Sequence, residues 1–204
     1  MMLLLSGGGD SEQVKQLDEY FANYVGDEKV LYIPVAMYKI PYDDCENWFR
    51  KTYAKYKISN IDVCTDLKKT PNLSEYKAIF IGGGNTFKLL KEIKESNFDY
   101  ALINYLKSGG FVYGGSAGAI IFGKTIETAN HADKNLVDLK DLNGINLLNG
   151  YDIWCHYNEK LDKKDILKLK ENTIILYEES GIIFDGSNFI TVGKEHLIYP
   201  NDFK

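Results

Sequence analysis

The stretch that decides the fold is Phe111-Val112-Tyr113-Gly114-Gly115-Ser116-Ala117-Gly118. Its first half is a short apolar run, typical of a buried strand. Its second half, Gly114-x-Ser116-x-Gly118, fits a nucleophile elbow, the sharp turn between a strand and a helix that exposes a serine hydroxyl. The small apolar residues that follow can begin a buried helix. We therefore predict a central strand, a strained turn at Ser116 and a helix directly after it.

Two other glycine-rich loops follow apolar runs earlier in the chain. Residues 1–5 lead into Gly7-Gly8-Gly9 and residues 78–81 lead into Gly82-Gly83-Gly84, and helical periodicity follows each loop. None of the glycine segments matches the Gly-x-Gly-x-x-Gly fingerprint with its downstream acidic residue, so a dinucleotide site is not predicted. For the loop at 7–9 we favour a plain tight turn over a cradle for an anion.

The rest of the chain continues the alternation of strands and helices. Further strands are predicted at 30–33, 58–64 and 151–155, and helices near 14–24, 45–56, 98–107 and 163–171. Three short strands are predicted near the C-terminus, at 173–177, 181–184 and 189–192. This order predicts a single α/β domain over residues 1–204, a three-layer αβα fold whose open sheet is mostly parallel, with an antiparallel C-terminal extension.

The composition is that of a folded, mildly acidic protein. Hydrophobic residues make up 45% and charged residues 26% of the chain, which excludes global disorder. A net charge of -5 lacks the basic footprint of a duplex-binding protein. The 3 cysteines contain no CxxC pair, so neither a disulfide framework nor a zinc cluster is predicted. The N-terminal apolar run is too short for a signal peptide or a membrane span, so we expect a cytoplasmic protein without nucleic-acid or membrane partners.

A serine hydroxyl needs a base to take its proton, and the chain has 3 histidines. His156 is the best candidate, because it follows an apolar strand-like run and would stand at the same sheet edge as Ser116. His131 lies in a polar segment, and His196 lies near the C-terminus. Cys155 is adjacent to His156 and would face the opposite way on a strand, so we predict a core position for this thiol.

An acidic residue should orient the imidazole and stabilise its protonated form. Glu179 or the adjacent Glu178 lies just past the predicted strand 173–177, whereas Asp133 lies in the loop after the elbow helix. Each of them is equally a candidate for a solvated surface carboxylate.

The negative oxygen of a tetrahedral intermediate also needs hydrogen-bond donors. The backbone N–H of Ala117 lies at the start of the predicted helix, where the helix dipole favours negative charge. Gly83 or Gly84, at the end of a neighbouring strand, could provide a second donor.

Three motifs together resemble one known family. They are GGGNT at residues 82–86, GGSAGA at 114–119 and His156-Tyr157, and they resemble peptidase E, the aspartyl dipeptidase family of serine peptidases. The resemblance extends over most of the chain. It implies a class I glutamine-amidotransferase-like α/β fold in which serine replaces cysteine, with a core similar to that of the cyanophycinases.

The resemblance also implies roles for single residues. Ser116 would be the nucleophile, His156 the base, and Gly84 and Ala117 the oxyanion donors. The family pattern allows an aspartate after the elbow or a glutamate on the later strand as the third member, and Asp133 and Glu179 match those two places. We prefer Glu179, because it ends a predicted core strand.

The activity implied by the resemblance is hydrolysis of the peptide bond after an N-terminal aspartate. The chain has a single arginine, Arg50, for two-pronged recognition of the aspartate carboxylate, and Lys160, Lys163 and Lys124 are the candidate substitutes. We therefore predict a serine exopeptidase for small peptides, with an N-terminal aspartate as one candidate for the recognised residue and no metal or cofactor. A homodimer is the assembly to test.

The alternatives are a different serine amidase or esterase, a cyanophycinase-like hydrolase, and a non-catalytic protein that binds a small anion on the same scaffold. A panel of substrates distinguishes the hydrolases. Labelling of the serine distinguishes all of them from a binding protein.

Overall fold

The computed structural model describes residues 1–170, 172–193 and 199–203. Within these residues the main sheet has seven strands in the order β3-β2-β4-β5-β1-β8-β9. Their bounds are Met2–Ser6 for β1, Val30–Ile33 for β2, Ile61–Val63 for β3, Ala78–Ile81 for β4, Phe111–Gly115 for β5, Ser180–Phe184 for β8 and Phe189–Gly193 for β9. Strands β1 to β5 pair in parallel, whereas β8 is antiparallel to β1 and β9 to β8. The predicted mostly parallel sheet with an antiparallel end is therefore confirmed.

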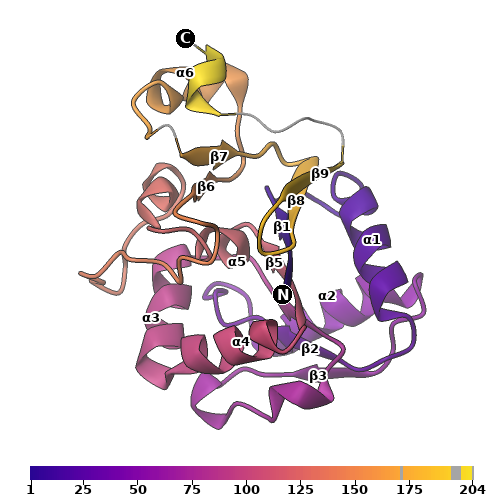
Figure 1. Cartoon of the computed structure of the whole chain (residues 1–204). Coiled ribbons are helices and arrows are strands. Elements are labelled where there is room, and N and C mark those ends of the chain that lie inside the picture. Colours follow the sequence, from indigo (N-terminus) through magenta and orange to yellow (C-terminus); the bar gives the residue numbers. More distant parts are fainter. Residues whose placement is uncertain (171, 194–198, 204) are drawn as a thin grey trace.

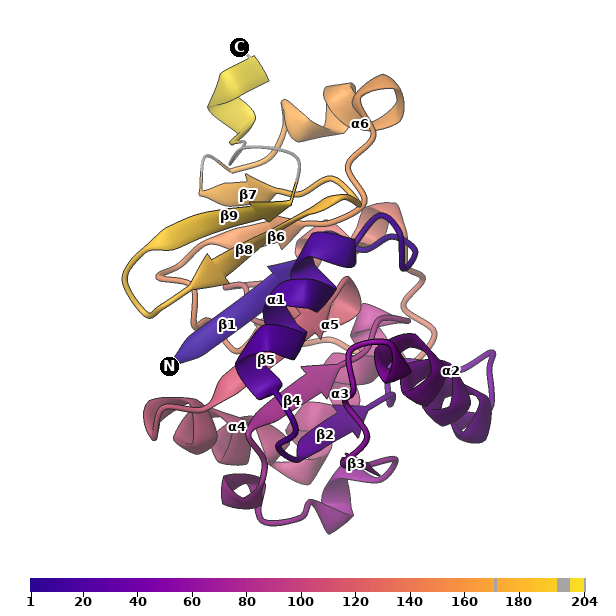
Figure 2. The same cartoon turned by 90° about the vertical axis from the view of Figure 1, so that its right-hand side faces the viewer.

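Helices cover both faces of this sheet (Figures 1 and 2). On one face lie α1 (Lys15–Val25) and α2 (Tyr42–Ala54), and on the other lie α3 (Thr86–Ser96), α4 (Phe98–Lys107) and α5 (Ala117–Ile120). The three-layer αβα arrangement is therefore also confirmed. No helix among the described residues is long and apolar enough to cross a membrane.

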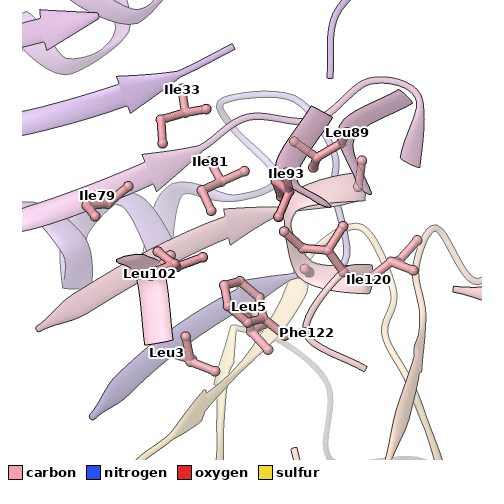
Figure 3. Packing of buried hydrophobic residues seen from close by; sticks show 14 of the residues in the cluster. Leu3, Leu5, Ile33, Ile79, Ile81, Leu89, Ile93, Leu102, Ile120 and Phe122 are labelled. Carbon is pink, nitrogen blue, oxygen red and sulfur yellow. The ribbon is translucent and has the colours of Figure 1, made fainter. Parts of the chain in front are cut away.

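The alternation of side chains along the strands builds one core on each face. Leu3, Leu5, Ile79 and Ile81 pack against α3, α4 and the segment after the elbow (Figure 3). Their strand neighbours, among them Leu4, Phe80 and Tyr113, face α1 and α2. Because strands buried on both faces need apolar residues at consecutive positions, this packing explains the short unbroken apolar runs in the sequence.

The C-terminal part differs from the prediction. The run predicted as strand 173–177 forms β7 (Thr173–Ile175), which pairs in parallel with β6 (Asp152–Trp154) in a separate two-stranded sheet. Only β8 and β9 form the antiparallel extension, because β7 pairs with β6 and not with the main sheet.

The helix predicted at 163–171 is α6 and covers Glu159–Ile166. It begins four residues earlier than predicted because the side chain of Asn158 caps it, accepting a hydrogen bond from the N–H of Lys160. Residue 171 lies outside the described residues. The strand predicted at 58–64 is shorter, since only Ile61–Val63 pair with β2.

Candidate active site

Ser116 stands between β5 and α5 with an unusual backbone conformation. Its φ of 49° and ψ of -107° lie outside the regions that a side chain normally allows, and α5 begins at the next residue. The Ser116 N–H donates to the carbonyl oxygen of Ser6 at 3.1 Å, which ties the turn to the end of β1. A Cβ atom on Gly114 would lie 2.2 Å from the carbonyl oxygen of Gly118, so the tightness of the turn excludes a side chain there. The strand, turn and helix predicted at 111–118 are all present.

His156 reaches the serine from the second sheet. Its Nε2 lies 2.7 Å from Ser116 Oγ, and its backbone also has a positive φ, of 56°. It directly follows Cys155, next to β6, so the expectation that its strand shares the sheet of Ser116 is wrong. The two side chains nevertheless meet, because the end of β6 lies beside the loop that follows β1.

That loop, Gly7-Gly8-Gly9, holds the imidazole in place. The His156 N–H donates to the carbonyl oxygen of Gly7 at 2.9 Å. Gly8 has a φ of 105°, and a Cβ atom there would lie 2.1 Å from Cε1 of the His156 ring. We predicted only a tight turn for this loop. The structure shows in addition that the loop forms the surface against which the His156 ring lies.

Glu178 completes the chain of polar contacts. Its Oε1 lies 3.1 Å from His156 Nδ1, and its Oε2 accepts a hydrogen bond from Gln13 Nε2 at 2.9 Å. The hydrogen bond with His156, followed by that from Gln13, lowers the pKa of the Glu178 carboxyl. An ionised carboxylate at Nδ1 favours the tautomer with its proton on that nitrogen, which leaves Nε2 free to accept the Ser116 proton.

Gln13 is a residue of the site that sequence reasoning did not identify. Its Oε1 accepts from the N–H of Asp10 at 2.8 Å, and Asp10 Oδ1 accepts from the N–H of Gln13 at 3.0 Å. This reciprocal pair is the capping pattern that begins a helix, and it stands just before α1. The contact of the Gln13 amide nitrogen with Glu178 joins residues 165 positions apart, which no local sequence pattern indicates.

The structure places Glu178, and not the preferred Glu179, against His156. Both glutamates lie in the turn between β7 and β8, where neighbouring side chains point in different directions. Asp133, the other candidate, accepts a hydrogen bond at its Oδ2 from the N–H of Thr86 at 2.8 Å. A carboxylate at this position stabilises the first turn of α3. Asp133 thus fixes the helix that follows the second glycine loop.

Free backbone donors lie beside the serine. Among the described residues, the N–H groups of Gly83, Gly84 and Ala117 donate to no protein acceptor. A Cβ atom on Gly83 would lie 3.5 Å from Ser116 Cβ, whereas one on Gly84 would face the carbonyl of Ala36 at 2.5 Å. The loop and the elbow are therefore in contact, with Gly83 nearest to the serine.

Comparison with known proteins places this chain in a family. The model of peptidase family S51 matches residues 2–197. The chain belongs to peptidase family S51. Membership confirms the resemblance seen in the motifs, and the S51 fold agrees with solved structures. A crystal structure from Listeria monocytogenes EGD-e superposes with a TM-score of 0.78 at 20% identity, covering 95% of this chain and 98% of that one. A peptidase from an acI-B1 Actinobacterium has a TM-score of 0.69 at 16% identity over 97% and 96% of the two chains.

Two curated relatives match this chain over only part of their own length. Peptidase E of Pasteurella multocida is 32% identical over 114 residues, which are 56% of this chain and 48% of the relative. Peptidase E of Actinobacillus pleuropneumoniae serotype 5b is 29% identical over 152 residues, 72% of this chain and 64% of the relative. This S51 chain therefore spans about half to two thirds of the length of these two relatives.

A cavity of about 670 Å³ opens at the serine of this S51 chain. Its walls come from the three glycine loops, α1, α2 and the segment 129–133. No lysine or arginine is among the described residues that line it; its charged lining residues are carboxylates, together with the two histidines. These acidic residues are Asp10, Asp18, Asp44 and Asp133.

The basic residues considered for substrate recognition lie elsewhere. Arg50 pairs with Glu46 at 2.7 Å and donates to the carbonyl of Ile61 at 2.9 Å. Lys124, Lys160 and Lys163 are exposed and are not among the residues that line the cavity. An aspartate substrate would therefore meet no lysine or arginine among the described lining residues.

The remaining histidines and the thiol have other positions. His131 lies on the cavity wall, stacks on Trp154 with 3.9 Å between ring centroids, and contacts the carbonyl of Thr128 through Nδ1 at 2.6 Å. His196 lies outside the described residues. Cys155 is fully buried, and burial raises the pKa of its thiol well above the ordinary value, so its predicted core position is confirmed. Among the described residues no group of three or more His, Cys, Asp or Glu side chains could hold a metal ion.

Proposed function

We propose that this S51 chain is a serine exopeptidase that hydrolyses small peptides through an acyl-enzyme. The observation that carries the proposal is the continuous set of contacts from Ser116 Oγ to His156 Nε2, at 2.7 Å, and from His156 Nδ1 to Glu178, at 3.1 Å, at the mouth of a cavity. A nucleophile, a base and an orienting carboxylate in this order are the parts that nucleophilic acyl transfer needs.

In the first half of the reaction, Ser116 Oγ attacks the carbonyl carbon of the scissile bond. The hydroxyl proton passes to His156 Nε2, and the negative charge moves to the carbonyl oxygen. His156 then gives this proton to the leaving amine nitrogen as the C–N bond breaks, which leaves an ester on Ser116. Glu178 stabilises the imidazolium that exists between these two transfers.

In the second half, water replaces the departed amine. His156 takes a proton from the water, whose oxygen attacks the ester carbon. The proton then passes to Ser116 Oγ as the ester bond breaks, which restores the enzyme and releases the acid product. We assign the N–H of Ala117, and that of Gly83 or Gly84, to the oxyanion of both tetrahedral intermediates. Loss of one such donor typically costs about 10²–10³ in turnover.

Small substrates are favoured by the size of the cavity. Its volume of about 670 Å³ lies within the range of sites that enclose small ligands. The acidic lining gives no support to a strict preference for an N-terminal aspartate, because a like charge would oppose the substrate carboxylate. A small peptide without that requirement is therefore the substrate class we propose.

The test compares the wild type with Ser116→Ala and His156→Ala on a panel of dipeptides, chromogenic amino-acid amides and esters. Each variant should lose on the order of 10⁴-fold or more in kcat. Ser74→Ala is a matched control, since Ser74 is exposed and its hydroxyl contacts Asn72, outside the cavity. Unchanged turnover in Ser116→Ala would refute the mechanism. Turnover of esters alone would favour an esterase.

Labelling with a fluorophosphonate gives an independent readout. Mass spectrometry should find one adduct, on Ser116, which is absent from the Ser116→Ala variant. A protein that binds small anions but takes no label and turns over no substrate would be the non-catalytic alternative.

A further inference from the structure

The cavity is lined by a buried carboxylate, that of Asp18, which the proposed reaction does not use. Asp18 follows Leu17 on α1 and lies three residues before Phe21, so helical spacing puts it on the buried face of that helix. Its exposed fraction is 2%, and it lines the same cavity as Ser116. Burial of a carboxylate lowers the stability of the fold unless its oxygens accept hydrogen bonds or pair with a cation, so the partners of Asp18 have to be identified.

Only one oxygen of Asp18 is satisfied by the protein. The hydroxyl of Tyr53, from α2, donates to Oδ1 at 2.7 Å, and that of Tyr113, from β5, donates to the same atom at 3.3 Å. Oδ2 receives no side-chain hydrogen bond from the described residues. The charge of the exposed Lys55 acts on this carboxyl but forms no ion pair with it. Burial raises the pKa of this carboxyl to about 6, against the effect of the two tyrosines, so the group is mostly ionised above neutral pH.

The walls around Asp18 suit a long apolar stem. Tyr32, Tyr53, Phe80 and Tyr113 line the cavity, and the ring of Phe80 contacts the other three. Aromatic faces accommodate methylene groups and attract cations. A carboxylate beside them can pair with an ammonium or guanidinium group.

We propose that Asp18 and the aromatic residues around it, Tyr32, Tyr53, Phe80 and Tyr113, form a specificity pocket for a positively charged side chain. The residue acylated on Ser116 is then lysine or arginine. This rests on the proposed function, since it names the substrate of the same serine. Tyr113 lies on β5 and Ser116 directly follows the end of that strand, three residues later, so their Cα atoms are at most about 10 Å apart. A lysine or arginine side chain, together with its carbonyl, can cover this span, whereas an aspartate side chain is too short and has the wrong charge.

The first experiment measures kcat/KM for Lys-Ala, norleucine-Ala and Asp-Ala dipeptides at pH 8. Norleucine has nearly the length of lysine without its charge. The wild type should favour lysine over norleucine by about 10- to 100-fold, the usual effect of a hydrogen bond to a charged group. In Asp18→Asn this ratio should fall to about 1. Equal ratios in the two proteins, or a wild type that prefers aspartate, would overturn the proposal.

Asp62→Asn is the matched control. Asp62 also accepts a hydrogen bond from a tyrosine hydroxyl, that of Tyr76 at 2.7 Å, but it lies on β3 and does not line the cavity. This variant should keep the preference for lysine. If Asp18→Asn does not fold, the lysine-to-norleucine ratio of the wild type still decides, because a pocket without a functional carboxylate gives no preference.

The second experiment separates this proposal from the peptidase activity. Calorimetry on Ser116→Ala measures the binding of lysinamide, norleucinamide and Nε-acetyl-lysinamide, none of which needs turnover. All three keep the α-amine, and only lysinamide has a charged side chain, so the pocket predicts that lysinamide binds at least 10-fold more tightly than the other two. Binding of Nε-acetyl-lysinamide or norleucinamide as tight as that of lysinamide would overturn the side-chain proposal. Absence of turnover in the wild type together with selective binding would reject the peptidase and keep the cation pocket.

Discussion

Replacement of Glu178 by glutamine tests how the site fixes the tautomer of His156. Oε2 of Glu178 faces the amide nitrogen of Gln13 at 2.9 Å, and the amide oxygen of Gln13 is held by the N–H of Asp10 at 2.8 Å. In Glu178→Gln the new amide must therefore present its oxygen to Gln13 and its NH₂ group to His156 Nδ1. The proton of the ring then moves to Nε2, and the base can no longer accept the proton of Ser116.

The expected loss has two parts that can be separated. The same change of the orienting carboxylate to an amide costs about 10⁴ in turnover in a serine-protease triad, a total that contains both the wrong tautomer and the lost charge. The charge alone costs less: across the 3.1 Å contact, Coulomb's law gives about 1.3 kcal/mol in water and about 5 kcal/mol at an effective permittivity of 20. Because the Glu178 side chain is 44% exposed, we expect an intermediate loss, on the order of 10² in rate, for the charge.

A double variant separates the two parts. In Glu178→Gln with Gln13→Glu, the carboxylate at position 13 accepts from the new NH₂ group, so the oxygen of the amide turns to His156 and restores the tautomer. Measured by kcat on the best substrate, the single variant should lose about 10⁴ and the double variant about 10².

Glu179→Gln serves as the control and should lose less than 10-fold, because Glu178 is the residue in contact with His156. A double variant no faster than Glu178→Gln would refute the tautomer argument. A larger loss in Glu179→Gln than in Glu178→Gln would refute the assignment of the carboxylate.

Two further predictions concern Gly8, which lies against the imidazole, and Asp133, which lies at the start of α3. Gly8→Ala should reduce kcat by at least about 10², because its Cβ would lie 2.1 Å from the His156 ring. Gly26→Ala is the control: its φ is 61° and a Cβ there would have nothing within 4 Å. It should destabilise the fold about as much as Gly8→Ala does, without this loss of kcat. Equal effects on kcat would show that backbone strain alone is responsible. Asp133→Asn should lower turnover by less than 10-fold and the thermal midpoint by a few degrees, because this carboxylate caps α3; a loss of kcat as large as that of Glu178→Gln would make Asp133 the orienting acid.

The sequence allowed the local parts of the site to be predicted because they are encoded by adjacent residues. The elbow at Ser116 depends on glycines within two residues of it, and its strand and helix follow from periodicity over a few positions. The same periodicity gave the αβα layers, since a parallel sheet covered on both faces needs unbroken apolar strands. His156 was identified because the chain offers few bases and one of them follows a strand.

The tertiary structure decided which side chains meet these local elements. Glu178 and Glu179 are adjacent and chemically identical, so only the course of the turn between β7 and β8 determines which carboxylate reaches His156. The second contact of this carboxylate, with Gln13, joins residues 165 positions apart. No local pattern carries such information.

The proposed specificity pocket depends even more on packing. In the sequence, Asp18 is indistinguishable from a solvated helix residue. It becomes a buried carboxylate only because α1 packs beside α2 and β5, whose Tyr53 and Tyr113 hydroxyls donate to it. Sequence alone determined the layers and the strand–turn–helix elbow, because short-range periodicity and turn geometry specify them, and it predicted the nucleophile and the base. The carboxylate, the surface under the imidazole and the charge of the cavity were decided by long-range packing, which brings side chains from separate segments to the same edge of the sheet.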